Sequence, residues 1–218
     1  RGTNRSLSGG SGTGKAHTGL QVLVAGTSIG ETGVFVSYEE DPNLLKNKAN
    51  SFGWDIEKLE DEGLLRVLYT SANQLNINKN ALAIKRIVEE IGAKRVVIDG
   101  INNFRYILND NAKVFEHVNI LAAYLASKNI TTIFTNEVSE LMGSSTISGD
   151  GTSIIMDSII LLRYVEIESE IKKAISVLKM RGSDHDKEIL ELVIDKNGIV
   201  VKLPFTEYSG LMSGNPVK

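Results

Sequence analysis

Short apolar runs separated by helical periods constrain this chain more than any other feature of its sequence. Four of these runs are rich in β-branched residues: 34–38, 95–98, 131–135 and 158–162. Continuous apolar runs of this length are typical of strands that are buried on both faces. Between them, apolar residues recur at the spacing of a helix face, as in 84–91 and 114–125. The alternation predicts an α/β fold with a mostly parallel central sheet flanked by helices.

The pattern changes after about Asp157. Residues 173–181 and 188–195 alternate between apolar and polar side chains, which is typical of half-buried strands. Lys196-Asn197-Gly198 is a good turn into the short apolar run 199–201. We therefore expect an antiparallel β extension at the C-terminal end of the sheet.

A glycine-rich segment near the start of the chain points to a phosphate ligand. Gly9-Gly10-Ser11-Gly12-Thr13-Gly14-Lys15 matches the pattern G-x-x-x-x-G-K, and an apolar helix is expected to follow it. Glycines let successive backbone N–H groups turn toward an anion, and the helix adds its positive end. A lysine at this place neutralises the β- and γ-phosphates. The predicted nucleotide-binding residues of this segment are Ser11, Gly12, Thr13, Gly14, Lys15, Ala16 and His17.

Residue 16 departs from the usual loop. A Ser or Thr ordinarily follows the lysine and binds the magnesium ion, and Ala16 has no hydroxyl. Thr18 is two positions further, about 200° round a helix, so it should face away from the site. Two alternatives stay open: a slow ATPase with altered metal use, and a nucleotide-binding scaffold without turnover.

Carboxylates follow two of the predicted strands. Asp99 ends the run 95–98, at the edge where open α/β sheets bind ligands, and is predicted to hold magnesium. Its alternative role is a helix N-cap. Glu39 and Glu40 follow the run 34–38, where acids orient the water that attacks a phosphoanhydride, and Glu39 is a second predicted metal ligand. Their alternative role is a charge at the start of a helix.

Cations gather on a strand of the C-terminal extension. Lys179 and Arg181 are two residues apart and Lys173 has the same parity, so one face of a regular strand would carry all three. Such a face favours a polyphosphate that approaches from outside the domain. Solvated lysines on an edge strand are the alternative. His185 and Lys187 extend the positive cluster.

Composition narrows the function classes. The 218 residues include 24 Lys and Arg against 27 Asp and Glu, a net charge of −3, which argues against a protein that binds duplex DNA. The absence of cysteine excludes thiolate catalysis and Cys-ligated metals. No run approaches a membrane span and no signal segment opens the chain, so a cytoplasmic protein is expected. Because the chain starts at Arg1 rather than Met, we interpret its N-terminal segment as truncated.

Together these segments resemble the KaiC-like ATPases of the RecA superfamily, and within them the second ATPase domain of the circadian clock proteins. The resemblance rests on GGSGTGK, VFVSYEE, FGWD, RVVIDG, FTNE, DSIILLRYVE and KMRGSDHDKEI, and runs from about Arg1 to Pro216. It implies a single RecA-like P-loop NTPase domain over residues 1–218. It also implies a ring, usually a homo-hexamer, with ATP and Mg²⁺ at the subunit boundaries.

The resemblance implies roles for individual residues as well. Glu39 and Glu40 would be the catalytic acids, Asn136 and Glu137 would lie near the γ-phosphate, and Phe52 would lie near the base. The residues that would reach the ATP of the neighbouring subunit are Lys173, Lys179, Met180, Arg181, Ser183, His185 and Lys187.

These expectations lead to one functional hypothesis and its rivals. The hypothesis is a ring-forming ATPase that acts as a signalling or timing module with a regulatory protein partner. Ser153 matches one of two adjacent phosphoacceptors of the clock protein, while Ile154 stands at the other, so a weak Ser/Thr autokinase activity is a further hypothesis. The first rival to the ATPase hypothesis is a RecA-like DNA-binding recombinase, and its second rival is the nucleotide-binding scaffold without turnover. The expected mobile loop 139–152 carries Glu140 and Asp150 but no Lys or Arg, so no nucleic-acid partner is expected.

Overall fold

A computed structural model describes residues 2–71, 74–138, 151–212 and 217–218. Its strands are β1 (Asn4–Gly9), β2 (Gly33–Ser37), β3 (Leu65–Tyr69), β4 (Arg95–Asp99), β5 (Thr131–Glu137), β6 (Ser158–Ile167), β7 (Glu170–Met180), β8 (Leu190–Asp195) and β9 (Gly198–Pro204). Its helices are α1 (Lys15–Thr27), α2 (Pro42–Ser51), α3 (Ile56–Asp61), α4 (Ile77–Glu90), α5 (Asn103–Leu108), α6 (Asn111–Ser127) and the 3-10 turn η2 (Thr152–Ile154). Most of the expected polar loop, 139–150, lies outside the described residues.

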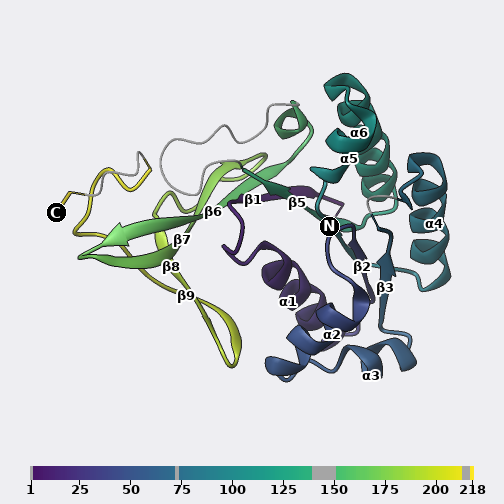
Figure 1. Ribbon diagram of the computed structural model, residues 1–218, viewed down its shortest axis with the longest axis horizontal. Coiled ribbons are helices and arrows are strands. Elements are labelled where there is room, and N and C mark those ends of the chain that lie inside the picture. The colour runs from purple at the N-terminus through teal and green to yellow at the C-terminus, as the bar shows by residue number, and fades with distance from the viewer. Residues whose placement is uncertain (1, 72–73, 139–150, 213–216) are drawn as a thin grey trace.

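The described strands form one sheet in the order β3-β2-β4-β5-β1-β6-β7-β8-β9 (Figure 1). The six strands from β3 to β6 are parallel, and β7, β8 and β9 extend the sheet in antiparallel fashion. The predicted mostly parallel sheet with an antiparallel C-terminal extension is therefore confirmed. All four apolar runs lie in its parallel part, in β2, β4, β5 and β6.

Two of the parallel strands, β1 and β3, were not predicted from the sequence. The central strand β1 buries the polar side chains of Asn4, Ser6 and Ser8, which broke the apolar pattern. The edge strand β3 contains Arg66, whose guanidinium donates to backbone carbonyls of Glu60 and Leu65. The strand β1 pairs with β5 and β6 through its backbone although most of its side chains are polar.

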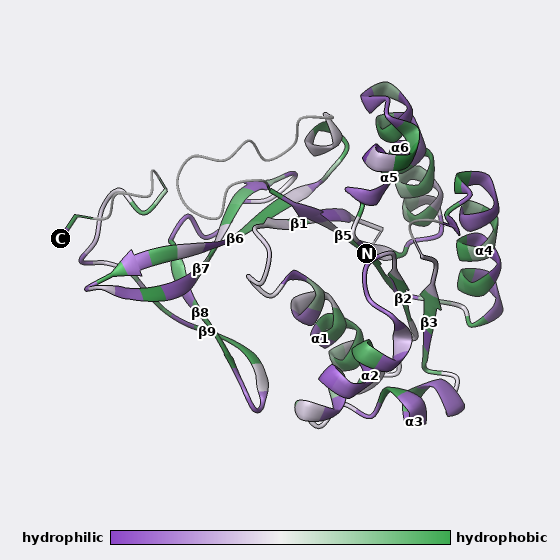
Figure 2. Ribbon diagram, in the orientation of Figure 1, coloured by the Kyte–Doolittle hydropathy of each residue, from purple (hydrophilic) through white to green (hydrophobic). Residues whose placement is uncertain are grey.

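Alternating side chains on the strands build two hydrophobic cores. Val34, Val36 and Phe134 belong to the core with α4, α5 and α6, whereas Phe35 and Val97 belong to the core with α1, α2 and α3. Figures 1 and 2 show these two groups of helices on opposite faces of the sheet. The apolar stripes of α4 and α6 point toward the sheet, as their sequence spacing predicted. None of the helices in the described ranges is long and apolar enough to cross a membrane.

The antiparallel extension corrects one expectation from the sequence. The register shifts in β6 between Ile159 and Ile160, which pair with Lys179 and Val177, so Leu178 is an extra residue in β7. Such a β-bulge reverses the alternation of side chains beyond it. Lys173 therefore faces the same side as Tyr164, while Lys179 faces the opposite side, and the expectation of one shared cationic face is wrong.

The β8–β9 hairpin packs against the start of α1. The predicted turn at Lys196 and Asn197 is confirmed, and β9 follows it. The Gln21 side chain donates from Nε2 to the Ile199 carbonyl over 3.0 Å, and its Oε1 accepts from the Ile199 N–H over 2.6 Å. The C-terminal extension thus holds the helix that follows the glycine-rich loop.

Close packing of α1 on β4 gives a first prediction. A Cβ atom at Gly19 would lie 2.8 Å from Val97 Cγ1, closer than side chains pack, so Gly19→Val should overfill this contact. We expect Gly19→Val to lower the free energy of unfolding by about 1–3 kcal/mol, measured by urea denaturation. Ala25→Val, at an exposed site of the same helix, should cost well under about 1 kcal/mol. Equal losses in the two variants would contradict the packing argument.

Candidate functional site

The glycine-rich segment forms a tight turn between β1 and α1. Gly12 and Gly14 have φ values of 73° and 108°, in the left-handed region that favours glycine, and Gly14 is the N-cap of α1. Thr13 is fully buried, and its hydroxyl donates to the Gly10 carbonyl over 2.8 Å. From the sheet side, Tyr164 limits the space at Gly12, where a Cβ would lie 2.7 Å from the phenol oxygen. The turn leads directly into the N-terminus of α1, where backbone N–H groups have no helical carbonyl partners.

Lys15 lies at the centre of the site. Its ammonium donates to the carbonyls of Gly9 and Gly10, over 3.0 and 2.9 Å. Burial lowers the pKa of Lys15, and the nearby carboxylates of Glu137, Glu39 and Asp99 oppose this shift. One lysine is thus surrounded by acids from the ends of β2, β4 and β5.

Asp99 is anchored by a buried hydrogen-bond network. Its side chain, 3% exposed, accepts from the Thr135 hydroxyl over 2.6 Å, and that hydroxyl accepts from the Gly100 N–H over 2.8 Å. Burial is the main cause that raises the pKa of Asp99 to about 6. The alternative role as a helix N-cap does not hold, because the N-cap of the following helix α5 is Asn102.

The adjacent acids Glu39 and Glu40 diverge. Glu39 packs over Gly100 and accepts from Asn103 Nδ2 over 3.5 Å, and burial followed by the charge of Glu137 raises its pKa. Glu40 forms an ion pair with Lys48 of α2 instead. Neither acid caps α2, because the Asp41 side chain accepts from the Asn43 N–H at that helix end.

These side chains line one cleft of ≈ 580 Å³ at the carboxyl ends of the parallel strands. It contains nine of the residues predicted for binding, catalysis or metal: Ser11, Gly12, Gly14, Lys15, Ala16, His17, Glu39, Glu40 and Asp99. It also contains Glu137, expected near the γ-phosphate, and Lys173, expected to reach a neighbouring subunit. Lys173 lies on the cleft wall of its own chain because its strand face is that of Tyr164.

Other predicted residues lie outside this lining. Asn136 is buried in β5. The Phe52 ring packs edge-on against His17 with centroids 5.4 Å apart, and the centroid of the Trp54 ring lies 4.9 Å from that of Phe52. Phe52 therefore supports His17 rather than lining the cleft directly.

The remaining cations lie beyond the β-bulge. Lys179 donates to the Ser153 carbonyl over 2.9 Å, and Arg181 donates to the Ile154 carbonyl over 2.6 Å. Both contacts tie the end of β7 to η2. Four more residues were expected to reach the nucleotide of a neighbouring subunit, and they do not line the cleft either. They are Met180 at the end of β7, and Ser183, His185 and Lys187 in the segment that follows.

The sequence analysis missed three residues that shape the site. Thr135 orients Asp99, Ile194 of β8 lines the cleft beside Gly14, and Lys48 lines it beside His17. The sequence contains one signal that could have indicated Lys48: it lies one helical turn before Phe52, a predicted site residue, and so shares its helix face. Thr135 and Ile194 come from distant strands, so only the folded sheet brings them to the loop.

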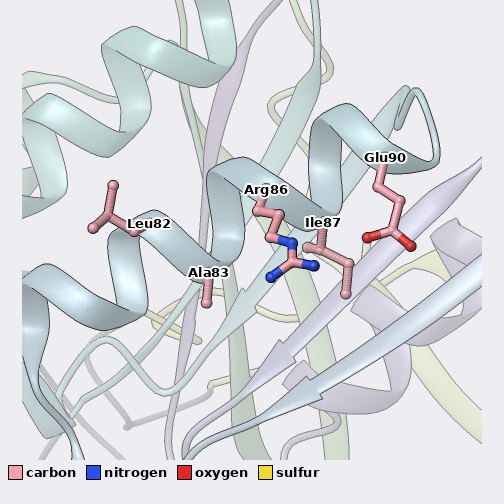
Figure 3. Close-up of a pocket in the computed structure, with 5 residues that line it drawn as sticks. All are labelled: Leu82, Ala83, Arg86, Ile87 and Glu90. Atoms are coloured by element: carbon pink, nitrogen blue, oxygen red, sulfur yellow. The ribbon is translucent and has the colours of Figure 1, made fainter.

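A second hollow lies on the outer face of α4, and Figure 3 shows the residues that line it. These residues are Leu82, Ala83, Arg86, Ile87 and Glu90. They form one side of a single helix and include no nucleophile. The chemistry of the described residues therefore concentrates in the cleft at the glycine-rich loop.

A phosphate loop between a central parallel strand and its following helix, with acids at the ends of adjoining strands, defines a P-loop NTPase of the RecA type. The sequence model of the KaiC ATPase family matches residues 1–204, and the chain belongs to this family.

Known relatives agree with this assignment. The circadian clock oscillator protein KaiC of Thermostichus vulcanus is 35% identical over 210 residues, which are 96% of this chain and 40% of that protein. KaiC of Prochlorococcus marinus is 35% identical over 208 residues, 95% of this chain and 41% of that protein. The chain thus spans about 40% of the length of these relatives.

A solved structure shows the same fold. The KaiC-like protein of the hyperthermophilic archaeon Pyrococcus horikoshii superimposes with a TM-score of 0.83 and 34% identity, covering 93% of this chain and 90% of that one. The predicted RecA-like fold is confirmed.

Two threonines of β5 provide a matched test of the Asp99 network. Thr135→Val removes the donor to Asp99 and the acceptor of the Gly100 N–H, so we expect a loss of about 1–3 kcal/mol in the free energy of unfolding. The hydroxyl of Thr132 is also buried, but it has no hydrogen-bond partner among the described residues. Thr132→Val should therefore be neutral or stabilising, since it removes an unsatisfied polar group. Urea denaturation of both variants would contradict the network if Thr132→Val were the more damaging change.

Proposed function

We propose that this chain is an ATP-hydrolysing domain. The single observation that supports this proposal most is the convergence of Lys15 with the carboxylates of Glu39, Asp99 and Glu137 in one cleft at the phosphate loop. A phosphate-binding cation beside acids that can orient water is the minimum that phosphoanhydride hydrolysis needs. Residues 1–218 would form one such domain.

The chain's own groups would bind the phosphates first. The backbone N–H groups at the start of α1 and the Lys15 ammonium would hold the β- and γ-phosphates, with Thr13 keeping the loop closed through Gly10. His17, supported by Phe52, lies on the same cleft and would flank the nucleotide. Burial and then the charge of Lys48 lower the pKa of His17, which favours a neutral imidazole there.

The donor set suits magnesium in part. Glu39 and Asp99 provide the carboxylate oxygens that Mg²⁺ prefers, and the Thr135 hydrogen bond occupies only one oxygen of Asp99. Ala16 provides no ligand, so these two acids and the phosphates would have to hold the ion. When bound, the ion would neutralise charge on the β- and γ-phosphates.

Glu39 is the better placed of the two acids to orient water. It lies over Gly100 near Lys15, and burial raises its pKa toward the range in which a carboxylate accepts a proton readily. Glu40 is held by Lys48 at the side wall of the cleft. We infer that Glu39 acts on the attacking water and that Glu40 contributes mainly to the shape and charge of the site.

The oligomer and the biological role belong to this proposal too. Lys179, Arg181, His185 and Lys187 lie outside the cleft of their own chain, which supports their role at the nucleotide of a neighbour in a homo-hexameric ring. A timing or signalling role, with a regulatory protein partner, follows only from the relatives named as clock proteins. Autokinase activity at Ser153 is proposed from the match of this residue to a phosphoacceptor position of the clock protein.

A non-hydrolysing nucleotide scaffold is the second candidate, and Ala16 favours it. The backbone cradle and Lys15 remain complete without a hydroxyl at residue 16, so binding does not depend on it. Turnover is what the missing metal ligand would impair.

Replacement of both cleft acids tests the proposed hydrolysis. We expect the Glu39→Gln, Glu40→Gln double variant to lower turnover strongly without loss of ATP affinity, because water orientation acts in the transition state and the replacements remove negative charge from the cleft. Phosphate release and equilibrium ATP binding would be measured on the same preparations. Hydrolysis at the parent rate in this variant would refute the role of the acids. No hydrolysis in the parent, with binding intact, would favour the scaffold.

A hydroxyl restored at residue 16 tests the effect of the missing metal ligand. Loss of one comparable electrostatic group slows catalysis by roughly 10²–10³-fold, so we expect Ala16→Thr to raise turnover and to sharpen its dependence on magnesium. Steady-state hydrolysis of both forms would be followed across magnesium concentrations. Equal rates at every concentration would show that Ala16 is tolerated.

A further inference from the structure

Lys48 adds a further positive charge to the cleft at the phosphate loop. It lies on α2 one turn before Phe52 and one turn after the buried Leu45, on the helix face that packs toward the start of α1. Its side chain lines the main cleft together with Lys15 and Ala16. It also lines a small hollow of ≈ 10 Å³ whose other walls include Ala16 and Glu40. The lysine therefore borders the space beside the alanine that replaces the usual metal-binding residue.

The ion pair with Glu40 holds Lys48 at this wall. Ser37 holds the backbone of Glu40 through two hydrogen bonds. The Glu40 N–H donates to the buried Ser37 hydroxyl over 3.0 Å, and that hydroxyl donates to the Glu40 carbonyl over 2.9 Å. The carboxylate of Glu40 then accepts from the Lys48 ammonium. A lysine ammonium has three donors, and this pair uses one of them. The Lys48 side chain is 36% exposed and forms part of the cleft lining.

The charge balance of the cleft makes each cation important. Its lining contains three lysines, Lys15, Lys48 and Lys173, and four carboxylates, Glu39, Glu40, Asp99 and Glu137. With all of them ionised the cleft has an excess of one negative charge. A nucleoside triphosphate adds several more negative charges, so removal of one lysine would weaken its binding by lost attraction and by added repulsion.

We propose that Lys48 is a second phosphate-binding cation of this cleft and that it supplies, beside Ala16, part of the charge that a metal ion would otherwise provide. The chain would then bind nucleoside triphosphate without a divalent metal, through Lys15 and Lys48 together. This inference rests on the proposed nucleotide site. It concerns ATP binding in the absence of metal, which is separable from hydrolysis.

Trp54 provides a direct readout of binding. It is the only tryptophan of the chain, and its ring lies 4.9 Å from Phe52, which in turn contacts His17 on the cleft. ATP would be titrated into the full chain in EDTA and again in excess magnesium, with Trp54 fluorescence recorded and equilibrium dialysis of labelled ATP as a second measurement. We expect the parent to bind ATP in both conditions. Lys48→Met should lose roughly 10- to 100-fold in affinity in EDTA, the range for one lost hydrogen bond to a charged group, and less in magnesium.

Two further variants separate charge from structure. Lys46→Met removes the same charge from the same helix, but Lys46 pairs with Glu60 over 3.0 Å and does not line the cleft. Its affinity in EDTA should stay within about twofold of the parent, because it is remote from the phosphates. Lys48→Arg keeps the charge and should retain most of the binding in EDTA. Circular dichroism would show that each variant is folded.

The outcomes distinguish this inference from the function on which it rests. Equal affinities of Lys48→Met and Lys46→Met in EDTA would overturn the role of Lys48, and so would a parent that binds ATP only in magnesium. In both cases the proposed nucleotide site would stand. A parent that binds ATP in neither condition would overturn the nucleotide site itself.

Discussion

The turn from β1 into α1 is the constraint on which the rest of this structure depends. It requires a left-handed backbone at Gly12 and Gly14, and side chains from distant strands lie within 2.8 Å of the place that a Cβ would take at either glycine. Tyr164 of β6 closes the space at Gly12, and Ile194 of β8 closes it at Gly14. The parallel sheet and its antiparallel extension therefore both support the loop. In this way the fold directs the N-terminus of α1 into the cleft.

Charge organises the site around this loop. Three acids from separate strand ends surround Lys15, and each is held in a different way. Asp99 is fixed by the Thr135 hydroxyl, and Glu39 lies over Gly100. The backbone N–H of Glu137 itself donates to Asn102 Oδ1 over 2.6 Å. The three carboxylates repel one another in a partly buried cleft. Lys15 and the hydrogen-bond donors offset this repulsion and so stabilise the arrangement. The same arrangement is ready to receive a bound anion together with its counter-ion.

The β-bulge in β7 divides the cations of that strand between two tasks. If β7 were regular, without the bulge at Leu178, Lys173 and Lys179 would lie on one face. With it, Lys173 lies in the cleft of its own chain, and Lys179 ties β7 to η2. One irregular residue thus decides which lysines can meet a nucleotide from within the subunit. The lysines on the two faces of β7 therefore have separate functions, one at the cleft and one at the contact with η2.

The sequence by itself determined the α/β class, the phosphate loop, the antiparallel extension and most of the acids. These features depend on local periodicity and on motifs whose residues are adjacent in the chain. Only the tertiary structure decided that Thr135 holds Asp99, that Glu40 turns to Lys48, and that Lys173 lines the cleft of its own chain. Each of these depends on strand order, register or a bulge, which arise from pairing between segments far apart and leave no periodic signal in either segment alone.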